Sequence, residues 1–188
     1  VDSFFVAKIS ENAMTAISLV FPMQNFINSV MIGFGIGINA VIAFYMGASD
    51  KETADKAASQ GLFLSTVHGI VLMAGCIILI RPFLNMFTND QTVIDLGVKY
   101  SVIAFAFSLM LAWELVFEKT FQAVGRMTVS MTAMLAGCIT NIILDPVLIF
   151  GPGIFPRMGI EGAAIATAIG QMLSLVIYLV FCVVRPLP

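Results

Sequence analysis

The stretch CITNIILDP, residues 138–146, places a carboxylate in a segment that otherwise has the composition of a membrane-spanning helix. Asp145 is the only charged residue between Arg126 and Arg157. An acid inside a span costs roughly 2.5–3.5 kcal/mol on insertion scales, and an ion or proton site is the usual reason for its presence. Asn141 lies four residues earlier, on the same helical face. The segment therefore predicts a membrane helix that carries a polar binding site.

Pro146 predicts a further oxygen donor at the same place. Proline has no N–H, and its ring crowds the carbonyl group four residues earlier, which here belongs to Ile142. We therefore expect a kink in this helix and a carbonyl oxygen left free beside Asn141 and Asp145.

The composition of the whole chain is that of an integral membrane protein. Of 188 residues, 60% are hydrophobic and only 11% are charged, whereas about a quarter of the residues in a soluble domain are charged. The net charge of −2 gives no reason to expect nucleic acid as a partner. Cys76, Cys138 and Cys182 lie in apolar runs without C-x-x-C spacing, so we expect neither a metal site nor a disulfide framework.

The apolar runs predict an all-α membrane fold. A helix needs about 20 apolar residues to cross a bilayer, and the runs predict helices at about 12–46, 55–80, 93–123, 127–150 and 159–184. Pro22 is expected to kink the first of them. Residues 1–8 are interpreted as the end of a truncated helix, so residues 1–188 are expected to form a single six-helix unit of a larger transporter.

The depth of the polar residues predicts one layer. Asp2 lies six residues before Lys8, and Asp145 lies six residues before Gly151, at helix ends that should face the same side of the membrane. Each acid is then about 9 Å along its helix from that side. Thr167 reaches a similar level on the last helix. Loops on the cytoplasmic side of a membrane protein carry more lysine and arginine. The side opposite the polar layer has five of these residues and the side of the layer has four, which weakly favours a polar layer nearer the outside.

Two other groups of ionisable residues are interpreted as structural. His68, in the middle of a span, is expected to be a neutral imidazole bonded to a neighbouring helix rather than a proton relay. Glu114 and Glu118 share a helical face and could form a paired-carboxylate site. Counting along the helix places them at the membrane surface, so Glu118 with Lys119 is interpreted as a solvated helix end.

Longer motifs resemble the multidrug and toxic compound extrusion (MATE) family. The runs NIILDPVLIFG (141–151) and MGIEGAAIAT (158–167) resemble its fifth and sixth helices, and VDSFFV (1–6) and GIGINA (35–40) resemble its first two. The run FEKTFQAVGR (117–126) is most similar to the MepA-like branch.

This resemblance implies a function. Members have twelve helices in two six-helix lobes and exchange Na⁺ or H⁺ for cationic amphipathic compounds by alternating access. The chain then corresponds to the N-terminal lobe of a multi-pass protein in a bacterial inner (plasma) membrane, with the C-terminal lobe missing. The expected partners are the lipid bilayer and cationic small molecules, and neither enzymatic activity nor a cofactor other than the coupling ion is expected. The cation or proton site of the family maps onto Asp2, Asn141, Asp145 and Thr167, which match in residue type.

The 12 methionines and 16 phenylalanines suit a cavity wall that adapts to different apolar cations. Met23, Met31, Phe34 and Met172 are the residues expected to line such a substrate cavity.

Two alternatives remain. A lipid-linked oligosaccharide flippase of the same superfamily would favour basic residues for pyrophosphate, whereas the buried charges here are acidic. An intramembrane aspartyl protease would need a Gly-x-Gly-Asp pattern, but Asp145 stands between Leu144 and Pro146.

Overall fold

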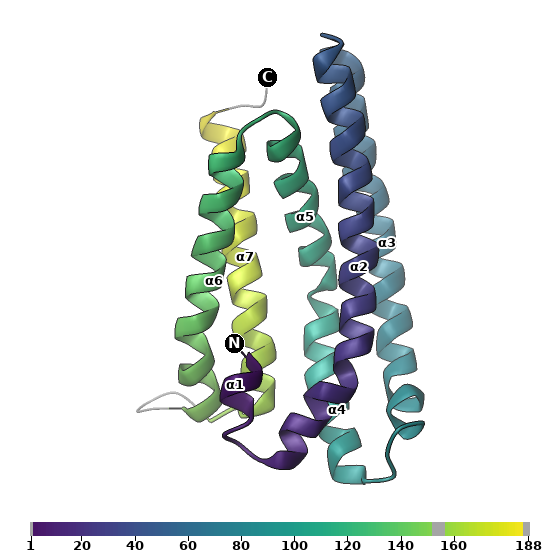
Figure 1. Ribbon diagram of the computed structural model, residues 1–188, viewed down its shortest axis with the longest axis vertical. Helices are drawn as coiled ribbons and strands as arrows, with labels where there is room; N and C mark the ends of the chain where they lie inside the picture. The colour runs from purple at the N-terminus through teal and green to yellow at the C-terminus, as the bar shows by residue number, and fades with distance from the viewer. Residues whose placement is uncertain (1, 152–156, 186–188) are drawn as a thin grey trace.

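The computed structural model describes residues 2–151 and 157–185, and every regular element in them is a helix (Figure 1). The predicted all-α fold class is confirmed. The elements are α1 (Asp2–Val6), α2 (Glu11–Gly47), α3 (Lys51–Asn85), α4 (Gln91–Ala106), α5 (Ser108–Ala123), α6 (Met127–Phe150) and α7 (Ile160–Val184).

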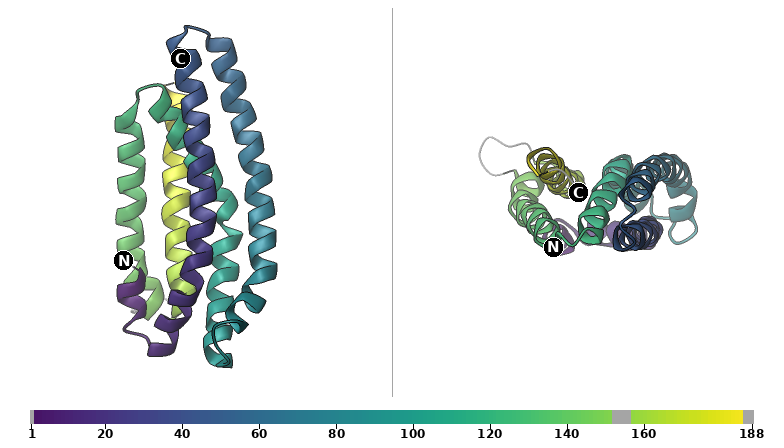
Figure 2. Two further views of the ribbon diagram at one scale, coloured as in Figure 1. Left: turned by 45° about the vertical axis from the view of Figure 1, so that its right-hand side comes forward. Right: turned by 90° about the horizontal axis from the view of Figure 1, so that it is seen from above.

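The helices run up and down with their links gathered at two ends. The α1–α2 and α3–α4 links lie at one end together with the C-terminus of α6, and the α2–α3 and α5–α6 turns lie at the other (Figure 1). Seen from above, α5 lies between the α2–α3 pair and the α6–α7 pair (Figure 2). This central position of α5 determines what its polar side chains contact.

The spans suit a membrane. Helices α2, α3, α6 and α7 are each long and apolar enough to cross a bilayer, and α4 with α5 forms a fifth candidate span bent by 42°. The sequence predicted one helix over this fifth region, but the structure breaks it at Phe107. Residues 100–113 contain neither proline nor glycine, so no residue that usually kinks a helix marks the break.

Glycines bring α6 and α7 unusually close. A Cβ atom added to Gly170 would lie 2.7 Å from the carbonyl oxygen of Gly137, and one added to Gly162 would lie 2.6 Å from that of Leu148. Small residues allow the backbones of membrane helices to approach in this way. Ser174 Oγ also donates a hydrogen bond to the Ala133 carbonyl across the pair, at 3.0 Å. Short polar side chains on α6 can therefore reach α7.

Candidate functional site

A polar cluster lies where α6 meets α7. Asn141 Nδ2 donates a hydrogen bond to Thr167 Oγ1 at 3.1 Å and a longer one to Asp145 Oδ1 at 3.5 Å. Asp145 is 0% exposed. The structure thus brings together three of the four residues that the sequence predicted for a cation site.

The local sequence explains this arrangement. Asn141 and Asp145 are one turn apart on α6, so their side chains share a face. Neither Pro146 in α6 nor Pro22 in α2 ends its helix. After α6, Gly151 adopts a left-handed conformation with φ of 60°. The N–H groups of residues 158 and 159 then bond back to the carbonyls of residues 148 and 149, which ties the start of α7 to the end of α6.

Asp2 belongs to α1, but its side chain lies outside the residues that the structure describes. Helix α1 packs against α6 and α7 (Figure 1). Val6 is 0% exposed, and the rings of Phe5 and Phe150 meet edge to face at 6.5 Å. These contacts put α1 at the same end of the bundle as Gly151, whereas a contact between the two acids stays a prediction.

The interpretation of Glu118 and Lys119 as a solvated helix end is wrong. Their side chains are only 17% and 18% exposed, and they form an ion pair of 2.9 Å. Gln122 bonds to both of them, at 2.8 and 3.0 Å. The physical reason is the central position of α5, since α2 covers it through Asn39, whose Nδ2 donates to the Lys119 carbonyl at 2.8 Å.

A cleft of about 310 Å³ lies between α5, α6 and α7. Glu114 and Glu118 line it on α5, and Asn141 and Thr167 line it on α6 and α7. Ser174 on α7 lines the same cleft. Sequence reasoning missed this arrangement because counting residues gives the depth of a side chain but not the neighbour that it faces. The cleft connects two acidic residues with the polar cluster.

The imidazole of His68 bonds within its own helix. Its Nδ1 lies 2.8 Å from the Leu64 carbonyl, and its ring lies 4.7 Å from the ring of Phe34 on α2. The predicted hydrogen bond to a neighbouring helix is therefore wrong, because the imidazole bonds instead to the backbone carbonyl one turn earlier in its own helix.

The four residues predicted to line a substrate cavity do not come together. Met31 is buried in the core at 4% exposure, and Met23 packs partly buried against that core. Phe34 faces α3, whereas Met172 on α7 is 40% exposed. None of them lines the α5–α6–α7 cleft in the part of the chain that the structure describes. Their role in substrate binding stays a prediction.

Apolar spans that enclose a carboxylate, an amide and a hydroxyl define a helical membrane protein with an intramembrane polar site. The chain belongs to the MatE family, whose model matches residues 1–147. The matched range includes Asn141 and Asp145 but ends before Thr167.

The chain is also similar in sequence and in structure to known membrane transporters. The chain is 30% identical to the FAD transporter of Shewanella oneidensis over 93% of its own length and 38% of that protein. It is 27% identical to the multidrug export protein MepA of Staphylococcus aureus, over 95% of this chain and 39% of MepA. A solved multidrug resistance MATE family transporter of the MOP superfamily, in an outward-facing conformation, superposes with a TM-score of 0.89 at 26% identity. That match covers 98% of this chain and 40% of the solved chain. The chain therefore spans about two fifths of the length of these relatives.

Proposed function

We propose that this chain forms the N-terminal lobe of a cation-coupled multidrug antiporter, which exports cationic amphipathic compounds in exchange for Na⁺ or H⁺. The observation that carries the proposal is the fully buried Asp145 carboxylate, which accepts a hydrogen bond from Asn141 where α6 meets α7. The names of the relatives, which include a multidrug export protein, support the same class of activity.

Asp145 is the coupling residue in this proposal. A carboxyl group inside a membrane favours its neutral form, whereas a neighbouring cation favours the ionised form. Asp145 can therefore bind a proton when the site is empty and release it when a cation enters. The carboxylate, the Asn141 amide oxygen and the Thr167 hydroxyl are also the hard oxygen ligands that Na⁺ requires, and Asp2 would add a second carboxylate. The same residues suit either ion.

The cleft beside this cluster is the proposed position for the substrate. Glu114 and Glu118 supply negative charge, and Leu111, Leu115 and Met134 supply apolar surface. Because Lys119 neutralises Glu118, Glu114 is the acid that a substrate cation would meet. A positively charged group could bind there while its apolar part lies against the leucine and methionine side chains.

Alternating access in such transporters moves one repeat against another around a site at their interface. The chain covers only 37–40% of the length of its relatives, and we expect it to transport nothing by itself. Vesicles that contain only this chain should not accumulate a cationic dye under an ion gradient, and accumulation would contradict the proposal.

The Shewanella oneidensis relative, named as an FAD transporter, favours a second candidate substrate. FAD carries negative phosphates, and Lys119 is held beside the cleft by its ion pair with Glu118, which lines it. Parallel uptake measurements with a cationic dye and with FAD in the same vesicles distinguish the two substrates.

The test of the coupling site is Asp145→Asn in the intact transporter, reconstituted in liposomes. The amide keeps the size of the side chain but cannot exchange a proton or balance a cation, so gradient-driven export should disappear. Asp95→Asn is the matched control, because Asp95 is 57% exposed in an ion pair with Arg81. Separate Na⁺ and proton gradients then identify the ion. Wild-type coupling in Asp145→Asn would end the proposal.

A further inference from the structure

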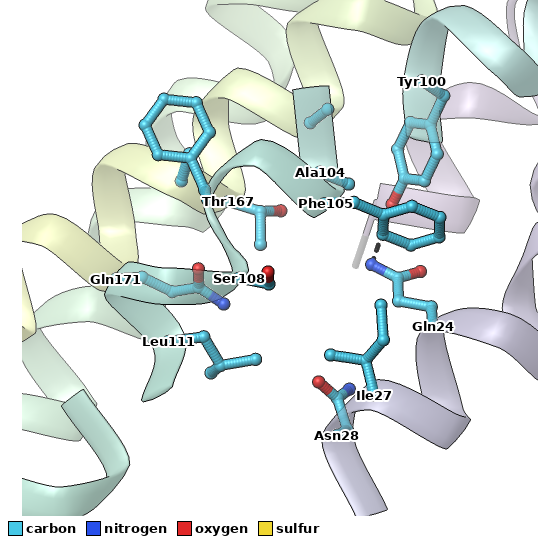
Figure 3. A pocket seen from close by; sticks show the side chains of 13 residues that line it. Gln24, Ile27, Asn28, Tyr100, Ala104, Phe105, Ser108, Leu111, Thr167 and Gln171 are labelled. Carbon is cyan, nitrogen blue, oxygen red and sulfur yellow. Dashed lines mark hydrogen bonds between the residues drawn. The ribbon is translucent and has the colours of Figure 1, made fainter. Parts of the chain in front are cut away.

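A second cavity, the chamber, lies on the other side of Thr167 from the cleft. It is lined by residues of α2, α4, α5 and α7 beside the break at Phe107 and has a volume of about 120 Å³ (Figure 3). About half of the residues that the structure places in its lining are polar, and none of them is charged. The polar members are Gln24, Asn28, Tyr100, Ser108, Thr167 and Gln171.

Ser108 indicates that the chamber holds a polar ligand. This side chain is 3% exposed, and its hydroxyl has no hydrogen-bond partner within residues 2–151 and 157–185. Figure 3 shows it beside Gln171, Thr167 and Leu111, inside the lining. A buried hydroxyl that forms no hydrogen bond is costly, so such groups in proteins normally bind another protein group or an ordered water. The bond between Gln24 Nε2 and the Tyr100 hydroxyl, at 3.4 Å, is also long.

We propose that the chamber is a binding site for ordered water. Its volume is well above the roughly 10–15 Å³ that one water needs, and it offers more than the two to four polar partners that a buried water uses. A metal cation would lack a carboxylate in the lining to balance its charge. An apolar ligand would leave the amides and hydroxyls without hydrogen bonds.

The position of the chamber gives this water a role that rests on the proposed coupling function. Thr167, Gln171 and Leu111 line both the chamber and the cleft, so they form the wall between them. Thr167 also accepts the hydrogen bond from Asn141. Water in the chamber therefore reaches the coupling cluster from the α2 side. The coupling ion can exchange with this water while a substrate fills the cleft.

Hydroxyl-radical footprinting of the intact protein in lipid nanodiscs tests for the water. Radicals formed from bound water by brief X-ray exposure modify the side chains next to it, and mass spectrometry measures the rate. Tyr100 and Phe105 line the chamber and are only 3% and 1% exposed. Tyr178 and Phe121 are matched controls, both 0% exposed and stacked on each other away from the chamber. We expect modification of the first pair several-fold faster than that of the second, and equal rates would overturn the proposal.

Two variants that fill the chamber from different helices, Ser108→Val and Ala168→Val, sharpen this test. Either one is informative when Tyr178 and Phe121 stay protected, because that shows the fold is intact. The rate at which Tyr100 is modified should then fall toward the rate of the control residues. An unchanged rate would show that the radicals that modify Tyr100 do not come from water in the chamber.

The same variants test the link to coupling in reconstituted transporter. Ion-driven transport should slow several-fold while substrate affinity is retained. An unchanged rate would refute the role of the water, whereas the Asp145→Asn experiment decides the coupling function separately.

Discussion

Gly170→Ala tests whether the close approach of α6 and α7 maintains the polar cluster. The new Cβ would lie 2.7 Å from the Gly137 carbonyl oxygen and 3.4 Å from the Asn141 Cβ. Non-bonded heavy atoms prefer a separation of roughly 3.5 Å or more, so the helices must move apart by roughly 0.8 Å. A hydrogen bond of 3.1 Å between Asn141 and Thr167 would then lengthen to nearly 4 Å, which is beyond a useful hydrogen bond.

The expected result is lower stability and weaker coupling together. Overpacking of this kind typically costs about 1–3 kcal/mol, which thermal unfolding in detergent measures, and ion-driven transport in liposomes measures the second effect. The matched control is Gly75→Ala on α3, where an added Cβ meets nothing within 4 Å and the higher helix propensity of alanine should be neutral or stabilising. If Gly170→Ala equalled Gly75→Ala in both measurements, the reasoning would be refuted.

Three other changes give separate tests. Lys119→Met leaves the mostly buried Glu118 carboxylate without its cation and should lower the unfolding temperature. The decrease should exceed that of Lys56→Met, because the side chains of Lys56 and its partner Glu52 are 66% and 81% exposed. Equal decreases would contradict the burial of the Lys119–Glu118 pair. Thr167→Val should weaken ion coupling while Thr167→Ser retains it, measured as gradient-driven transport, because only the serine keeps the hydroxyl that bonds to the amide of the cluster. The side-chain hydrogen bond of Thr53, and next its backbone hydrogen bond, hold the pKa of Asp50 below its ordinary value. The cap of α3 should therefore persist at neutral pH and weaken only in acid, where this carboxyl takes up a proton, and Asp50→Ala should speed amide exchange in the first turn of α3 at neutral pH only.

Hydropathy and the four-residue spacing on α6 were sufficient to predict the membrane class and the meeting of Asn141 with Asp145. These features depend on one helix at a time. The burial of Glu118 could not be predicted in the same way, because it depends on which helices surround α5. The break at Phe107 escaped prediction for a similar reason, since no proline or glycine marks it and packing between helices is absent from the sequence pattern. The Ser108 hydroxyl gained significance only when its neighbours were known.

The length of α2 has a mechanical consequence. At 1.5 Å per residue its 37 residues extend about 55 Å, against roughly 30 Å of hydrocarbon, and its turn into α3 stands beyond the neighbouring α5–α6 turn (Figure 1). The α2–α3 pair is therefore a lever whose tip magnifies small rotations within the membrane. A tilt of only about 10° around its far end would displace residues 48–50 by roughly 10 Å, given that length. Two spin labels, one at this tip and one on the α5–α6 turn, would report such a tilt as a change in the distance between them. That change is easily measured, whereas the same rotation moves the packed parts of the helices too little to detect.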